Sequence, residues 1–139
     1  MVPFVACMGL VASFYHLPPR VLPAIQGVEG GRPGLVHHNS DRTVDLGVMQ
    51  INTRWLLPIA RFTREQPAVV YQRLRDDACY NIAAGGAILR TYLRETHGNL
   101  LAAIGDFHSH TPALNMRYRV QVLRSASSLF TPRRAHLAG

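Results

Sequence analysis

The chain has 139 residues, 47% of them hydrophobic and 17% charged, a balance typical of a globular protein and not of a disordered one. This length fits one domain, and no run approaches the roughly 20 apolar residues that a membrane-spanning helix needs. Fifteen basic residues against eight acidic ones give a formal charge of +7, which favours a polyanionic partner. Charge alone does not choose among a nucleic acid, an acidic membrane surface and an anionic wall polymer.

Two helices are predicted in the first 31 residues. Apolar residues recur at helical spacing over residues 3–16, and Pro18-Pro19 separates this helix from a second one marked by Leu22, Ile25 and Val28. Gly30 and Gly31 end the second helix. The apolar first dozen residues have no basic segment before them and no clean cleavage site, so we expect a helix of the mature fold and not a signal peptide.

The rest of the chain also favours helices. Residues 32–45 are polar and predict a long loop, which in a compact domain is usually functional. Helical character is expected over residues 46–60 in two pieces divided near Asn52, and over 67–75, 76–96, 100–107 and 112–123. No segment alternates long enough to predict a strand. The predicted fold is all-α: a compact orthogonal bundle over residues 1–124, with one long loop and a basic, flexible C-terminal tail over residues 125–139.

Glu29 is the residue most suited to acid–base chemistry. It follows Leu22 by seven residues and Ile25 by four, so it shares the apolar face of its helix. It also lies in the last turn, where the negative end of the helix dipole disfavours a carboxylate. Both effects would raise its pKa, as a general acid near neutral pH requires. Periodicity alone favours the alternative of an exposed glutamate at a helix end.

Cys7 and Cys79 are the two cysteines, and they form no Cys-x-x-Cys motif. From the residues alone, one disulfide and two buried thiols are equally compatible with their positions. His37-His38 and His108-x-His110 invite a metal site, but no carboxylate–histidine spacing of a metal motif accompanies them, and solvated or groove-lining histidines are the simpler interpretation. We therefore expect no metal and no cofactor.

Four blocks occur in order along the chain: L-P-P-R-V-L-P-A-I-Q-G-V-E-G-G, D-L-G-V-M-Q-I-N, D-D-A-C-Y-N-I-A-A-G-G and I-G-D-F-H-S-H. Together they resemble the soluble lytic transglycosylase domain of the lysozyme-like superfamily, over residues 4–123. The similarity is greatest to the small wall-cutting enzymes of type IV secretion, conjugation and pilus systems. The most specific part is Glu29 followed, a loop's distance later, by Gly47-Val48-Met49-Gln50-Ile51-Asn52.

The resemblance implies a reaction. Glu29 would protonate the oxygen between N-acetylmuramic acid and N-acetylglucosamine in peptidoglycan, then take a proton from the muramic 6-hydroxyl as a 1,6-anhydro ring closes. Such a lyase needs one protein carboxylate, unlike the paired carboxylates of ordinary glycosidases. Asp41 and Asp45 lie in the loop as candidate second acids, with solvation or turn capping as the alternative.

The same resemblance assigns substrate-binding residues. They are Gly47, Met49, Gln50, Asn81, Phe107, His108 and Tyr118, with Ser40 and Thr43 as loop candidates and Tyr118 expected to bond near Glu29. Without the resemblance, Met49 would be an ordinary core residue and Tyr118 an ordinary half-buried tyrosine. One departure is Gly30, because the family often has serine directly after the glutamate.

The resemblance also implies a Cys7–Cys79 disulfide, which would close a loop of about 70 residues and contribute on the order of 4 kcal/mol. The implied partners are peptidoglycan strands and components of secretion or pilus machinery, with no nucleic acid, in the periplasm or cell envelope. Three alternatives stay open. They are a hydrolytic muramidase on the same fold, a non-catalytic glycan-binding domain, and a nucleic-acid module, although the arginines are scattered and follow no DNA-reading pattern.

Overall fold

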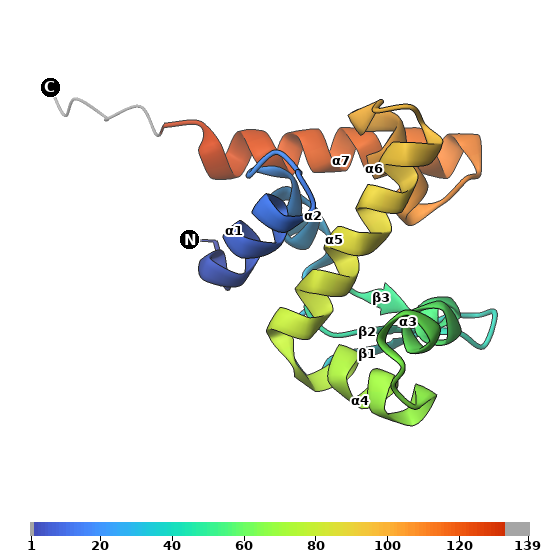
Figure 1. Cartoon of the computed structure of the whole chain (residues 1–139). Coiled ribbons are helices and arrows are strands. Elements are labelled where there is room, and N and C mark those ends of the chain that lie inside the picture. Colours follow the sequence, from blue (N-terminus) through green and yellow to red (C-terminus); the bar gives the residue numbers. More distant parts are fainter. Residues whose placement is uncertain (1, 133–139) are drawn as a thin grey trace, which may run out of the picture.

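A computed structural model describes residues 2–132 and confirms a mostly helical fold (Figure 1). The helices are α1 (Val5–Phe14), α2 (Val21–Glu29), α3 (Leu56–Thr63), α4 (Pro67–Asp76), α5 (Ala78–Glu95), α6 (Leu100–His108) and α7 (Pro112–Phe130). A 3-10 turn, η1 (Thr53–Trp55), precedes α3. None of the helices described for residues 2–132 is long and apolar enough to cross a membrane.

Helix α5 is the centre of the fold. It packs against α1, α4 and α6, and α7 packs in turn against α2 and α6 (Figure 1). Completely buried side chains from α1, α2 and α5 meet in the core, among them Met8, Leu22, Ile25, Ile82 and Leu89. Each such side chain contributes about 1.5–3 kcal/mol by leaving water. This core fixes the end of α2, where Glu29 lies, relative to α5 and α7.

A small antiparallel sheet was not predicted. Strands β1 (Val36–His38), β2 (Val44–Leu46) and β3 (Ile51–Asn52) pair in that order, with Val36 opposite Leu46 and Leu46 opposite Ile51. The expectation of a helix over residues 46–52 is therefore wrong. The turn between β2 and β3 holds Gly47 and Gln50 at φ values of 69° and 52°, a left-handed conformation that an α-helix excludes.

Helix α7 is longer than expected. It continues through Ser125 to Phe130, so the predicted tail begins within a helix. The extension packs on α2, where Gly27 has no side chain and leaves room for the Ser125 hydroxyl, and the Arg20 guanidinium lies 5.2 Å from the Phe130 ring centre. The predicted flexible tail from residue 133 onward lies outside the described residues.

The expected Cys7–Cys79 disulfide is present and joins α1 to the first turn of α5, with the two Cα atoms 5.5 Å apart. Further along the same interface, Gly86 of α5 lies against Val11 of α1 and against Tyr15, the residue that follows α1. A Cβ atom at position 86 would overlap Val11, so the close approach of the two helices requires glycine there.

Candidate active site

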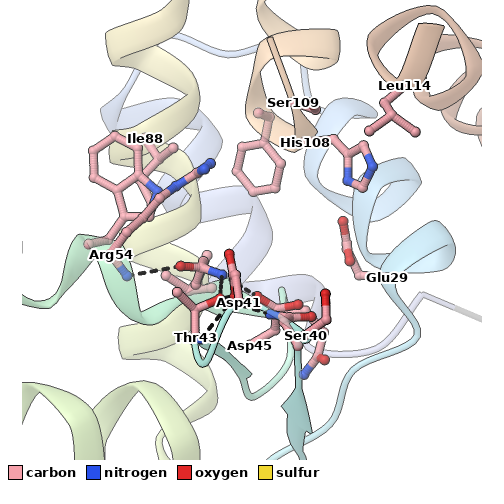
Figure 2. A pocket seen from close by; sticks show the side chains of 16 residues that line it. Glu29, Ser40, Asp41, Thr43, Asp45, Arg54, Ile88, His108, Ser109 and Leu114 are labelled. Atoms are coloured by element: carbon pink, nitrogen blue, oxygen red, sulfur yellow. Dashed lines mark hydrogen bonds between the residues drawn. The ribbon is translucent and has the colours of Figure 1, made fainter. Parts of the chain in front are cut away.

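A cleft of 420 Å³ opens between the sheet and the ends of α2 and α6 (Figure 2). Glu29, His108 and Leu114 lie at one side of it, and Arg54 and Ile88 lie at the other. Most of the groups between them are hydroxyls, amides and carboxylates. These polar lining residues are Asn39, Ser40, Asp41, Thr43, Asp45, Gln50, Asn52 and Ser109.

Glu29 is the last residue of α2, and its carboxyl group faces the cleft. Gly30 ends the helix in the left-handed conformation at φ 64°, and its N–H donates to the Gln26 carbonyl at 2.8 Å. Burial raises the pKa of Glu29 to about 7, and the charge of Asp45 adds to the rise, whereas the hydrogen bond from Tyr118 opposes it. The expected desolvation is confirmed, and a large fraction of Glu29 keeps its proton near neutral pH.

Tyr118 of α7 is the predicted partner of Glu29. Its hydroxyl donates to Oε1 of Glu29 at 2.7 Å, and the residue is only 2% exposed. Burial, together with the nearby Glu29 carboxyl, raises the pKa of Tyr118, so the phenol stays protonated and remains a donor. The imidazole of His108 stacks on the Tyr118 ring with centres 4.6 Å apart and planes 8° from parallel.

His108 is the last residue of α6, and its side chain lines the cleft. Partial burial lowers its pKa, with Arg54 acting in the same direction and Asp45 against it. The imidazole is therefore mostly neutral at pH 7, and presents one donor and one acceptor nitrogen. Its sequence neighbours Phe107 and Ser109 also line the cleft.

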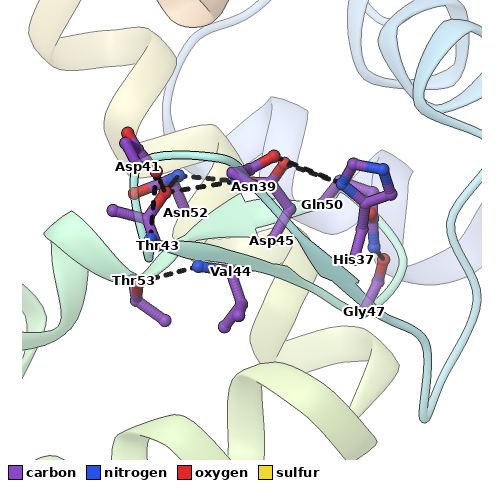
Figure 3. Close-up of polar contacts among 10 residues, drawn as sticks. All are labelled: His37, Asn39, Asp41, Thr43, Val44, Asp45, Gly47, Gln50, Asn52 and Thr53. Carbon is purple, nitrogen blue, oxygen red and sulfur yellow. Dashed lines mark hydrogen bonds and ion pairs between the residues drawn. The ribbon is translucent and has the colours of Figure 1, made fainter.

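The loop between β1 and β2 is held by side-chain hydrogen bonds (Figure 3). The Asn52 amide donates to Thr43 Oγ1 and to Asp45 Oδ1, both at 2.9 Å. Asp41 accepts from the backbone and the hydroxyl of Thr43, and these bonds lower the pKa of Asp41. Asp41 is thus an ionised turn-capping residue, the simpler of its two predicted roles. Ser40 and Thr43, the loop candidates for substrate binding, both line the cleft, and Thr43 is also part of this hydrogen-bond network.

Asp45 differs from Asp41 because it lies on β2, half-buried in the cleft. Its second oxygen is 3.9 Å from Nδ1 of His37, and its charge raises the pKa of both Glu29 and His108. Asp45 is therefore the second carboxylate of the cleft whose charge raises the pKa of Glu29.

Three predicted substrate-binding residues have a structural role instead. Asn81 is completely buried, and its amide accepts from Met49 N at 2.7 Å and donates to the Leu46 and Leu74 carbonyls at 2.7 and 2.8 Å. Met49 is also completely buried and packs on Gly85 of α5. A Cβ at Gly47 would overlap the Leu74 carbonyl, so its close approach is to the chain itself and not to a ligand.

Gln50, which the sequence analysis assigned to substrate binding, lines the cleft. Its side-chain amide nitrogen donates to the Gly47 carbonyl at 2.8 Å, which fixes the side chain over the turn. The side-chain oxygen of Gln50 takes no part in this bond and can accept from a ligand. The left-handed backbone at φ 52° is unusual for a residue with a side chain and costs on the order of 1 kcal/mol. Such strain is common where a fold positions a side chain for binding.

The sequence-based prediction missed seven lining residues: Asn39, Ile51, Asn52, Arg54, Trp55, Ile88 and Leu114. The sequence offered one signal for Asn52, because asparagine is a preferred residue at the start of a helical turn. Asn52 caps η1 by accepting from Arg54 N at 2.9 Å. Trp55 is the only tryptophan in the chain, and its ring edge meets Tyr92 of α5 with centres 6.0 Å apart. No residue pattern signalled that η1 would face the cleft, because η1 follows from the unpredicted sheet.

Within residues 2–132, no three His, Cys, Asp or Glu side chains converge closely enough to hold a metal ion. His37 instead pairs with Asn39 at 3.2 Å, and His110 stacks edge-on against Tyr92.

Comparison with known proteins finds relatives of this chain. No protein-family model matches the chain. The chain is 26% identical over 106 residues to Invasion protein IagB of Salmonella typhimurium strain SL1344, which covers 76% of this chain and 62% of that protein. The protein of the same name from Salmonella typhi has the same identity and coverage. The chain therefore spans somewhat less than two-thirds of the length of these relatives, and the similarity supports common ancestry with them.

Proposed function

We propose that this protein is a peptidoglycan lytic transglycosylase that cleaves the β-1,4 bond between N-acetylmuramic acid and N-acetylglucosamine. One observation carries the proposal: Glu29 has a pKa of about 7 at one end of a polar cleft, with its carboxyl held by Tyr118. A carboxylic acid that is protonated in part and ionised in part near neutral pH suits both halves of an acid–base cycle.

In the first half of the cycle, protonated Glu29 donates its proton to the glycosidic oxygen. The bond from this oxygen to muramic C1 breaks, and N-acetylglucosamine leaves with a hydroxyl group. In the second half, ionised Glu29 removes the proton of the muramic 6-hydroxyl while that oxygen bonds to C1. The 1,6-anhydro ring closes, Glu29 is protonated again, and no water is consumed.

Tyr118 supports both halves by holding one carboxyl oxygen. Because its hydroxyl donates to Oε1, the other oxygen of Glu29 is left to carry and receive the proton. The hydrogen bond also favours the ionised form and limits how far burial raises the pKa. His108, stacked on the same tyrosine, adds neutral hydrogen-bonding groups for a sugar at this end of the cleft.

The charge of the cleft favours a sugar polymer over a nucleic acid. Three carboxyl groups line it, those of Glu29, Asp41 and Asp45, against the single guanidinium of Arg54. Phosphates would be repelled from this surface, whereas amide, hydroxyl and carboxylate groups are ordinary partners for sugar hydroxyls and acetamido groups. The positive charge of the whole chain suits a wall polymer that carries peptide carboxylates.

We place the protein in the periplasm or cell envelope, where its substrate is found, and propose that it opens the wall locally for a secretion, conjugation or pilus assembly. The motif resemblance and the similarity to proteins named for invasion support this placement. The Cys7–Cys79 disulfide agrees with an oxidising compartment.

A hydrolytic muramidase is the second candidate, and Asp45 is the observation that favours it. Its carboxylate lies in the same cleft and acts on the pKa of Glu29, as the second acid of a glycosidase would. However, Asp45 already accepts from Asn52 and faces His37, so part of its charge is engaged in holding the loop.

Mass spectrometry of the muropeptides released from purified peptidoglycan separates these candidates. We expect 1,6-anhydromuramic products from the wild type, a loss of rate of at least about a hundredfold with Glu29→Gln, and retained anhydro products with Asp45→Asn. Glu95→Gln, at an exposed helix end outside the cleft, is the matched control. Reducing-end products that vanish with Asp45→Asn would establish hydrolysis instead, and full activity of Glu29→Gln would refute both.

A further inference from the structure

A second groove, of 390 Å³, adjoins the candidate active site. It lies between α3 and α5, and Trp55 and Ile88 line both the groove and the cleft. The indole and the Ile88 side chain therefore form the boundary that the two cavities share. A ligand chain that lies in the cleft could enter the groove without leaving the protein surface.

The groove differs from the cleft in chemistry. Its apolar lining includes Trp55, Ile59 and Phe62 on one side and Ala84, Ala87 and Ile88 on the other. It lacks the asparagine, aspartate, glutamine and serine side chains that line the cleft. A sugar ring placed there would bury hydroxyl groups against methyl groups with few partners, which is unfavourable. Short aliphatic side chains fit this lining better.

The charged groups of the groove are two guanidiniums. Arg90 and Arg94, one turn apart on α5, line the groove beside Thr91. In the part of the chain that the structure describes, neither arginine forms an ion pair, and no Asp or Glu lines the groove. The groove is thus apolar along its length and positive beside α5, and the charge complementary to it is a carboxylate.

We propose that this groove binds the stem peptide that the glycan strand carries on its muramic acid residues. Such a peptide has alanine methyl groups for the apolar lining and free carboxylates for Arg90 and Arg94. The assignment rests on the proposed function, because it takes the cleft to hold the glycan of the same polymer. The protein would then recognise peptide-bearing strands in preference to bare ones.

The test uses the full chain with Glu29→Gln, which binds without cutting. Its ligands are short glycan strands with intact stem peptides and the same strands after an amidase has removed the peptides. Fluorescence of Trp55, the only tryptophan, reports binding because the indole lines both cavities. We expect the peptide-bearing strands to bind about tenfold more tightly than the bare strands.

Added substitutions locate the effect. Arg90→Gln with Arg94→Gln should abolish the preference and leave binding of bare strands unchanged, and Phe62→Ala should weaken the preference. Arg32→Gln with Arg124→Gln, two exposed arginines outside both cavities, removes the same charge and should leave the preference intact. Equal affinity for the two kinds of strand, or equal weakening of both by the Arg90 and Arg94 changes, would overturn the assignment.

The outcome is separable from that of the proposed function. Peptide-dependent binding without anhydro products from the wild type would retain the groove assignment and refute the transglycosylase. Anhydro products with no peptide preference would do the reverse.

Discussion

The Tyr118 hydroxyl donates a 2.7 Å hydrogen bond to Oε1 of Glu29 and thereby joins the middle of α7 to the last residue of α2. This contact couples the proton affinity of the candidate acid to the packing of two helices. Loss of this contact would raise the pKa of Glu29 further, because the hydrogen bond favours the ionised carboxylate. The pKa of Glu29 therefore depends on how α7 packs against α2.

Activity should depend on pH through Glu29. Because the first step needs the protonated acid and the pKa is raised to about 7, the rate should fall as pH rises above about 7. Tyr118→Phe removes the bond that stabilises the ionised form, so we expect the alkaline limb to move upward by about 1–2 pH units, with a lower maximal rate. A pH–rate profile measures both effects.

Tyr71→Phe is the control for this change, since Tyr71 is half-buried on α4 and lines neither cavity. Its profile should match that of the wild type. An unshifted alkaline limb in Tyr118→Phe would show that the tyrosine does not set the pKa of Glu29.

The raised pKa of Glu29 also makes a prediction about stability. The unfolded chain loses this proton near pH 4.5 and the folded protein near pH 7, so the folded state loses stability as pH rises through this window. Glu29→Gln cannot ionise. The free energy of unfolding of the variant, relative to the wild type, should therefore increase by about 3 kcal/mol between pH 4 and pH 8.

Urea unfolding of both proteins at the two pH values measures this difference, because the other ionisable groups are common to both and cancel. A difference that stays constant with pH would mean that Glu29 is solvated like an ordinary surface glutamate.

Asn81 should be more important for stability than for binding. Asn81→Ala leaves the Met49 N–H and the Leu46 and Leu74 carbonyls without their buried partner, which we expect to cost about 2–4 kcal/mol of unfolding free energy. Asn99→Ala, which removes only the cap of α6, should cost about 1 kcal/mol. Chemical denaturation ranks the two, and a smaller loss for Asn81→Ala would contradict the structural role.

The Cys7–Cys79 disulfide closes a long loop, because the two cysteines are 72 positions apart in the sequence. Replacement of both cysteines by serine should lower the free energy of unfolding by about 4 kcal/mol through the entropy of the unfolded chain. Denaturation midpoints of the variant, and of the wild type with and without reductant, test this. Identical midpoints in all samples would show that the bridge adds no stability.

The helices could be predicted from the sequence because each has enough residues to show its period. Val21–Glu29, Leu100–His108 and the start of α7 at Pro112 agree closely with the expected limits. The sheet could not be predicted, because strands of two or three residues show no alternation. The turn between β2 and β3 is held by hydrogen bonds between residues far apart in the sequence, such as those of Asn81. The end of α7 was missed since its Ser-rich last turns are helical through packing on α2.

The sequence identified those cleft residues that belong to a motif, among them Glu29, Gln50 and His108. Motif position could not distinguish residues that face the cleft from those that support it, and Asn81 and Met49 belong to the second kind. Among the missed residues, Arg54 and Trp55 follow the unpredicted third strand, so their orientation depended on a structure that no local pattern showed.

The partners of the Asn81 amide are all main-chain atoms: one N–H and two carbonyls. Every amino acid supplies a main-chain carbonyl, and every one except proline supplies an N–H, so the amide fixes the path of the turn while it excludes only proline at position 49. Other substitutions that keep positions 46, 49 and 74 apolar should leave the cleft unchanged in shape. The turn could thus diverge in sequence among related proteins, or accept a redesigned lining, while a single asparagine preserves its geometry.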